Sequence, residues 1–131
     1  MMKRIPSLFA ILPLCLAACT AKPTKDAPPP QKVRLAKIIV DSTQLDAYKS
    51  FLQEEIEASI NKEPGVITLY AVFEKEQPTH LTILEIYATE ADYQAHVKTP
   101  HFLKYKNGTQ NMVQHLELVE VDPLVPGLIK K

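Results

Sequence analysis

The sequence contains no tryptophan, only three glycines and only two cysteines, and its formal net charge at pH 7 is zero. Both cysteines, Cys15 and Cys19, lie close to the amino terminus of the 131-residue chain. A neutral chain whose lysines are spread out along the sequence does not resemble a nucleic-acid-binding protein. The three glycines form neither a G-x-G-x-x-G fingerprint nor a phosphate-binding loop, which argues against the common nucleotide cofactors.

The first residues have the layout of an export signal. Met1 to Arg4 form a short basic stretch, Ile5 to Leu14 are mostly apolar, and small residues precede Cys19. The apolar run is too short to cross a bilayer as a stable helix. The Leu-Ala-Ala-Cys ending resembles the lipobox of bacterial lipoproteins. An ordinary signal peptide that happens to contain cysteines is the alternative interpretation.

The lipobox resemblance implies that residues 1–18 are a signal peptide and that a lipid is attached to the sulfur of Cys19. Thr20 follows this cysteine, and the sorting rule for such proteins then implies the outer membrane, facing the periplasm. Cys15 leaves with the signal, so the mature chain has no free thiol for a disulfide or a thiolate metal site. We therefore expect a protein of the bacterial cell envelope that contacts the membrane only through its lipid anchor.

The remaining chain divides by composition into three parts. Residues 19–32 begin with the cysteine and contain the run Pro28-Pro29-Pro30, which favours an extended tether. Residues 33–123 are expected to form a single domain, because the chain is short and 46% hydrophobic. Residues 124–131 are expected to form a tail.

The pattern of the domain predicts four strands with helical segments between them. Strands are expected at 33–40, 66–73, 80–88 and 115–122. A helix is predicted after Ser42 or Thr43, with Leu45, Tyr48, Leu52, Ile56 and Ile60 on its apolar face and a stop at Glu63-Pro64-Gly65. Two shorter helices are predicted with Thr89 and Thr99 as caps and with Pro100 opening the second. This order predicts an α+β, ferredoxin-like β-α-β-β-α-β fold. Because the helices can cover only one face of an apolar sheet, we also expect a homodimer that buries the other.

The stretch from Glu85 to Tyr105 brings together the strand carboxylate Glu85, two histidines and three tyrosines. Strand alternation places Glu85 on an otherwise apolar or aromatic face, where its pKa should rise unless the carboxylate finds a partner. Such a group suits a general acid or base, and a structural carboxylate is the alternative. His96 ends one short helix and His101 lies in the first turn of the next, near free amides that favour an anion. Either histidine can move a proton, or both can tie the two helices together.

Four motifs resemble the antibiotic biosynthesis monooxygenase (ABM) family. They are Glu63-Pro64-Gly65, Glu85-x-Tyr87, Ala95-His96 and Thr99-Pro100-His101-Phe102-x-x-Tyr105. The resemblance implies a dimeric α+β barrel with a pocket between sheet and helices in each subunit. Several members oxidise quinols or polyphenols with O₂, without metal or flavin, so no cofactor and no metal are expected here. We take Glu85, His96 and His101 as candidate catalytic residues, and Tyr87, Phe102 and Tyr105 as candidate substrate contacts.

Two positions depart from better understood branches of the family. Tyr87 stands where many monooxygenase members have tryptophan, and it is more like a branch that isomerises a phosphorylated sugar. Lys106 stands where the haem-degrading branch has its axial histidine, so haem is not expected. Three functions follow: an oxygenase for a small aromatic or quinol-like substrate, a non-catalytic ligand-binding module of the envelope, or an isomerase-type proton-transfer enzyme.

Overall fold

The computed structural model describes residues 29–131, so the predicted signal, Cys19 and most of the tether lie outside the described residues. The elements are β1 (Lys32–Val40), η1 (Ser42–Gln44), α1 (Leu45–Lys62), β2 (Val66–Phe73), β3 (His80–Tyr87), α2 (Glu90–His96), α3 (Pro100–Thr109) and β4 (Val113–Glu120). This order confirms the predicted ferredoxin-like α+β fold, with the second helical region divided into α2 and α3. Among the described residues, none of the helices has both the length and the apolar character needed to cross a membrane.

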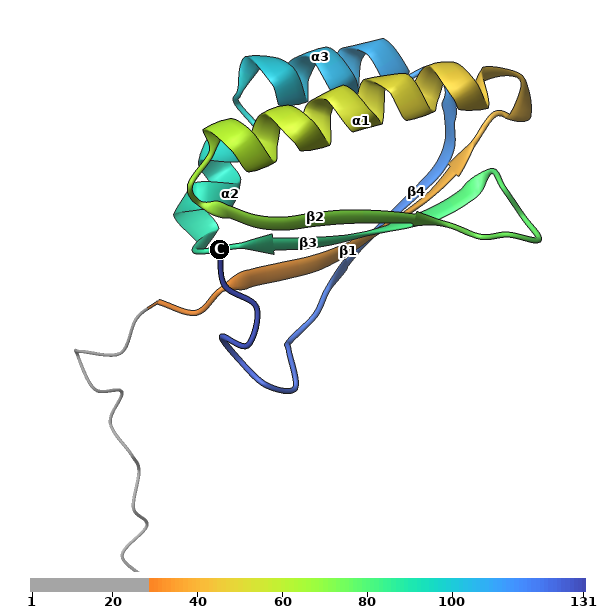
Figure 1. The fold of residues 1–131 in the computed structure, drawn as a ribbon. Coiled ribbons are helices and arrows are strands. Elements are labelled where there is room, and N and C mark those ends of the chain that lie inside the picture. The colour runs from red at the N-terminus through yellow and green to blue at the C-terminus, as the bar shows by residue number, and fades with distance from the viewer. Residues whose placement is uncertain (1–28) are drawn as a thin grey trace, which may run out of the picture.

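The sheet has the strand order β2-β3-β1-β4, and all three neighbouring pairs are antiparallel. α1 and α3 lie side by side over one face of the sheet, and α2 lies at one end of it (Figure 1). The carboxyl-terminal segment passes along the opposite side and ends close to α2 (Figure 1). There the Lys131 Nζ donates a hydrogen bond to the carbonyl oxygen of Glu63 at 2.7 Å.

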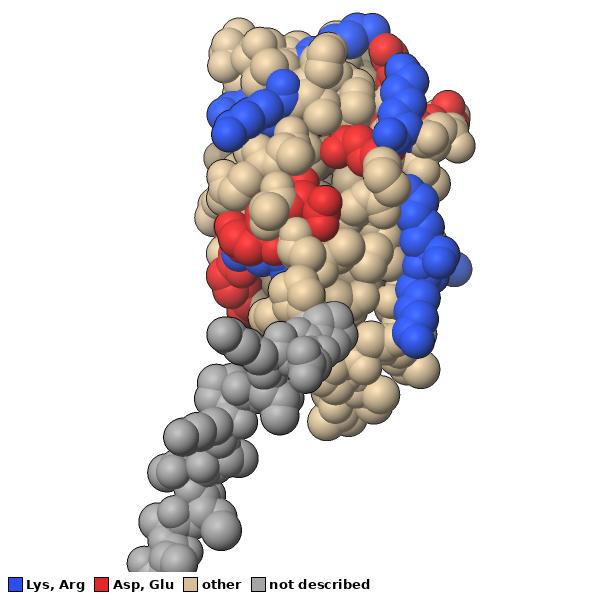
Figure 2. All heavy atoms as spheres, turned by 90° about the vertical axis from the view of Figure 1, so that its left-hand side faces the viewer, with Lys and Arg blue, Asp and Glu red and all other residues tan. Residues whose placement is uncertain are grey.

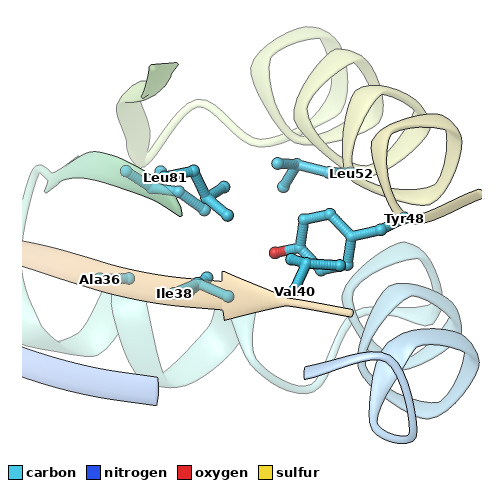
Figure 3. Packing of buried hydrophobic residues seen from close by; sticks show 7 residues of the cluster. Ala36, Ile38, Val40, Tyr48, Leu52 and Leu81 are labelled. Carbon is cyan, nitrogen blue, oxygen red and sulfur yellow. The ribbon is translucent and has the colours of Figure 1, made fainter. Parts of the chain in front are cut away.

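The core lies between α1 and the central strands. Figure 3 shows Tyr48 and Leu52 pointing from α1 toward residues of β1 and β3. The strand residues of this cluster are Ala36, Ile38, Val40, Leu81 and Ile83. Fully burying one large apolar side chain contributes about 1.5–3 kcal/mol, so this layer holds α1 firmly on the sheet.

Two local predictions were wrong in detail. The side chain that caps the turn into α1 belongs to Asp41, whose Oδ1 accepts a hydrogen bond from the Thr43 backbone N–H at 2.8 Å. Neither Ser42 nor Thr43 caps the helix, because both form the short 3₁₀ turn η1 that precedes it. The last strand begins at Val113, two residues earlier than predicted, since Val40 pairs with Val113 beyond a register shift in β1.

The caps of the two shorter helices were predicted correctly. Thr89 accepts a hydrogen bond from the backbone N–H of Asp92, and Thr99 accepts one from that of Phe102. Asp92 also packs against Gly65, where a Cβ atom would come within 2.6 Å of the Asp92 Cβ. The glycine therefore allows the first turn of α2 to approach β2 closely, which sets the position of His96 at the other end of that helix.

The end of the molecule that carries α2 has charges of both signs. Figure 2 views this side and shows acidic side chains gathered near its middle, with lysine and arginine side chains along its margins. On this face the described residues thus form a mixed surface rather than one of a single sign.

Candidate active site

A cavity of about 570 Å³ lies between the sheet and the helices that cover it. Five of the six candidate site residues line it, namely Glu85, Tyr87, His96, Phe102 and Tyr105, whereas His101 lies outside the lining. The other lining residues are Arg34, Ala36, Ile38, Leu52, Glu55, Leu69, Ile83, Tyr93, Val97, Lys106, Thr109, Gln110, Val113, Leu116 and Leu118. Every strand and every α-helix of the fold contributes to this wall, which is largely apolar with a few polar groups.

The cavity reaches solvent alongside β4. Leu116 pairs with Ile38 and Leu118 pairs with Ala36, so both leucines face the helix side of the sheet. Both are nevertheless about half exposed, at 53% and 49%. The described helices therefore leave this edge of the sheet open, and it provides an apolar route into the cavity.

Glu85 finds its partner in Arg34, which lies directly opposite on β1. The guanidinium donates to Glu85 Oε2 from Nε at 3.0 Å and from Nη2 at 2.7 Å, and the Tyr87 hydroxyl donates to the same oxygen at 3.1 Å. Burial opposes the charge of Arg34, but the neighbouring Glu85 carboxylate keeps the pKa of Arg34 above its ordinary value. Arg34 also stacks over the Tyr93 ring, 4.5 Å from its centroid, and donates to the Tyr93 hydroxyl. Glu85 is therefore a paired carboxylate, as in the structural alternative, and not an isolated acid on an apolar face.

A second carboxylate, Glu55 of α1, lines the same cavity and is only 4% exposed. Its Oε1 accepts a hydrogen bond from the Ser59 hydroxyl at 2.8 Å and lies 3.5 Å from His96 Nε2. Burial raises the pKa of Glu55, against the opposing effects of Ser59 and His96. Of the described residues, no lysine or arginine forms a salt bridge with it. Glu55 therefore has the surroundings that the sequence suggested for Glu85.

His96 joins the cavity to a cluster of polar groups behind it. Its ring is almost fully buried, packs against Phe102 and Tyr87, and has its Nδ1 3.0 Å from Glu63 Oε1. His101 Nε2 is hydrogen-bonded to the same carboxylate oxygen. Burial alone would raise the pKa of Glu63, but the hydrogen bonds from the two histidines hold it below its ordinary value.

The tyrosines of the site are hydrogen-bond donors rather than bases. Burial raises the pKa of Tyr105 to about 12, and it raises the pKa of Tyr87 further. Both phenols are therefore protonated near neutral pH. The Tyr105 hydroxyl lies 2.7 Å from that of Tyr48, which also belongs to the core.

Three polar residues of this region were missed as site residues. Arg34 lies two and four residues before Ala36 and Ile38 on β1, so strand alternation places it on the same inward face. Glu55 lies seven residues after Tyr48 and so shares its helix face. Glu63 was interpreted only as a helix stop and a family motif, because its two histidine partners come more than thirty residues later.

The family model for antibiotic biosynthesis monooxygenase matches residues 33–108. This is more than half of the chain, so the chain belongs to the antibiotic biosynthesis monooxygenase family. The match confirms the family resemblance of the motifs around Glu63, Glu85 and Thr99. None of the curated proteins compared with the chain matches it.

Solved structures agree with this assignment. A predicted antibiotic biosynthesis monooxygenase from Bacteroides thetaiotaomicron VPI-5482 is 58% identical, with a TM-score of 0.76, and the match covers 78% of this chain and 97% of that one. A predicted monooxygenase from Lactobacillus acidophilus NCFM is 27% identical, with a TM-score of 0.67, over 70% of this chain and 44% of that one. A predicted family member from Nitrosomonas europaea is 24% identical, with a TM-score of 0.68, over 73% and 92% of the two chains, which shows the fold alone.

Replacing Arg34 with methionine should destabilise the fold strongly, because it leaves the Glu85 charge buried without a cation. Loss of one partner of a buried pair costs about 3–5 kcal/mol, and we expect the free energy of unfolding in urea to fall by that amount. The double variant R34M/E85L should recover most of the loss. Lys37→Met is the matched control on the same strand, because its pair with Glu117 is half exposed and worth less than about 1 kcal/mol. Equal losses in R34M and K37M would contradict this account of the pair.

Proposed function

We propose that this protein is a cofactor-independent monooxygenase that oxidises a small quinol or phenolic aromatic with O₂ in the cavity behind β4. Membership of the family supports the class of reaction. The cavity supports the class of substrate, because its volume lies in the usual range for small-molecule sites and its wall is mainly apolar and aromatic. A substrate of one or two aromatic rings can enter along Leu116 and Leu118.

The observation that carries the proposal is the position of Glu55. It is a carboxylate on the cavity wall, almost completely buried, with no cationic partner among the described lysines and arginines. A base in such a place can take the proton of a bound phenol, since burial leaves its lone pairs unsatisfied by water. His96 Nε2 lies 3.5 Å from Glu55 Oε1, close enough to hold the Glu55 carboxylate in place.

The other candidate residues then take supporting roles. Arg34 has more N–H donors than Glu85 and Tyr93 use, and at the wall of the cavity it can stabilise a phenolate oxygen. The Tyr87 hydroxyl donates to Glu85 and so helps to hold the ion pair in place. Glu85 positions Arg34, and His101 acts on His96 through Glu63. In this proposal Glu85, His96 and His101 are positioning residues, while Glu55 acts on the substrate.

The proposed reaction balances without an added reductant. The base removes the phenolic proton, and the phenolate passes one electron to O₂. The two radicals then combine at a ring carbon, and cleavage of the O–O bond leaves one oxygen atom on the ring and the other in water. A phenol and O₂ thus become a quinone and water, with all four electrons supplied by the substrate. The apolar wall keeps water away from the intermediates.

Glu55→Gln should abolish substrate-dependent O₂ uptake, because the amide cannot accept the phenolic proton. We expect a fall in kcat of at least about 100-fold with a reduced naphthoquinone as substrate, measured with an oxygen electrode. The neighbouring Glu54→Gln is the matched control, since Glu54 is exposed and pairs with Lys104. Unchanged turnover in E55Q would remove Glu55 from the mechanism.

An isomerase or a ligand-binding module could use the same cavity, and the same assay distinguishes both from a monooxygenase. An isomerase would need the proton transfer by Glu55 but not O₂, so its turnover would be equally fast under anaerobic conditions. A ligand-binding module would release its ligand chemically unchanged. The proposed monooxygenase requires that removal of O₂ stops the reaction and that the product contains one oxygen atom from labelled O₂.

We further propose that the chain is a lipoprotein held at the bacterial outer membrane through Cys19. The support is the lipobox-like sequence that ends at this cysteine, together with the proline-rich residues that follow it. This arrangement would keep the domain in the periplasm, within reach of amphipathic quinols.

Cys19→Ser should prevent lipid attachment, because the hydroxyl does not replace the thiol in the modification. In cells given labelled palmitate, we expect the wild-type chain to carry the label and the C19S chain to lack it and leave the membrane fraction. Cys15→Ser is the matched control and should keep the label. Label retained in C19S would exclude this anchor.

We also propose that two copies associate through the sheet face that carries no helix. Tyr70 and Val72 of β2 lie on this face and are 65% and 46% exposed, which is unusual for large apolar side chains. A second copy of the same face would bury them and convert each sheet into half of a barrel.

Tyr70→Glu should therefore shift the protein from dimer to monomer in sedimentation velocity experiments. Burying an unpaired carboxylate in the interface opposes association, whereas the exposed position makes the substitution harmless to the monomer. Lys75→Glu, in the exposed β2–β3 turn, is the control and should leave the dimer intact. A wild-type monomer, or a Y70E dimer of unchanged affinity, would exclude this interface.

A further inference from the structure

Glu63, His96 and His101 bring one carboxylate oxygen and two imidazole nitrogens together within 4.8 Å of one another. Glu63 follows the last residue of α1, His96 ends α2, and His101 lies in the first turn of α3. These three helix ends meet at one end of the fold (Figure 1). From this geometry we infer that the cluster binds a divalent transition-metal ion of the Zn²⁺ type.

The distances fit such an ion after a small adjustment. Tetrahedral zinc with bonds of about 2.0–2.1 Å places its ligand atoms roughly 3.3 Å apart. Glu63 Oε1 lies 3.0 Å from His96 Nδ1 and 2.5 Å from His101 Nε2. The ligand atoms lie within 4.8 Å of one another, so the ion requires the two imidazoles to approach each other while His101 moves away from Glu63. The side chains of Glu63 and His101 retain some exposure, 14% and 13%, so the ion can reach them and water can complete its coordination.

The surroundings of His96 match those of a metal ligand. A histidine that binds a metal through one ring nitrogen usually donates its other N–H to a carboxylate. Here the Nε2 of His96 faces Glu55 Oε1 at 3.5 Å, and Ser59 in turn donates to that oxygen. Glu55 and Glu63 together carry the two negative charges that balance a divalent ion. This arrangement selects Nδ1 as the nitrogen that binds the metal.

The ion would lie outside the substrate cavity. His96 lines the cavity, whereas Glu63 and His101 do not. The site therefore suits an ion that holds His96 and Glu55 in place, rather than one that touches substrate or O₂. This positioning role rests on the proposed function, whereas the binding of the ion does not. Glu63 lies 33 and 38 residues before the two histidines, so the sequence shows no close spacing of ligands that would indicate a metal site.

Titration calorimetry of the metal-free full chain, purified without a tag in non-ionic detergent, tests the inference with Zn²⁺ alone. We expect one ion per chain. His101→Ala and Glu63→Gln should each weaken the affinity at least about 10-fold, because each removes a ligand atom. His115→Ala, on the exposed strand β4, is the control and should bind normally. Circular dichroism without metal checks that each variant is folded.

Cobalt offers a second, spectroscopic measurement on the same samples. Bound Co²⁺ should give the visible absorption of a tetrahedral site in the wild type and in H115A, and lose it in H101A. The inference is overturned if the wild type binds no ion in excess of the chelator control, or if H101A and H115A bind alike. Zinc binding without O₂ uptake would retain the metal site and reject the proposed function.

Discussion

The ion pair between Arg34 and Glu85 is the constraint on which the site depends. Two charges buried next to an apolar cavity are tolerated only when each satisfies the other, and here the register of β1 and β3 places them directly opposite. Glu85 Oε2 accepts two hydrogen bonds from Arg34 and one from the Tyr87 hydroxyl, and Arg34 donates another to the Tyr93 hydroxyl. Glu55 has no lysine or arginine partner among residues 29–131, which makes the two cavity acids chemically different.

A second constraint comes from the ends of the three helices. Gly65 allows α2 to pack closely on β2, and the threonine caps at Thr89 and Thr99 set where α2 and α3 begin. As a result His96 and His101 both point to Glu63, although they belong to different helices. His96 then connects this cluster with the substrate cavity through Glu55. The packing of the three helix ends therefore affects the position of Glu55, the proposed base.

Local patterns predicted the fold well because they depend on neighbours along the chain. The strand 66–73, the caps at Thr89 and Thr99, and the helix stop near Glu63 follow from alternation and capping chemistry. The site was only partly predictable. Glu85, His96, Tyr87, Phe102 and Tyr105 line one cavity as the motif suggested, but His101 stands behind it. Glu55 was not recognised from the helix pattern of α1, because a single acidic residue in a helix is usually interpreted as exposed to solvent.

The amino-acid sequence alone determined the order of the elements, the family and the residue types available for proton transfer, since all of these are encoded in short-range pattern and motif. Only the tertiary structure decided which carboxylate has a cationic partner. Arg34 and Glu85 are fifty-one residues apart, and Glu63 is thirty-eight residues from His101. Charge pairing, burial and ligand clustering depend on distances in space, and these exist only after the strands have paired and the helices have packed.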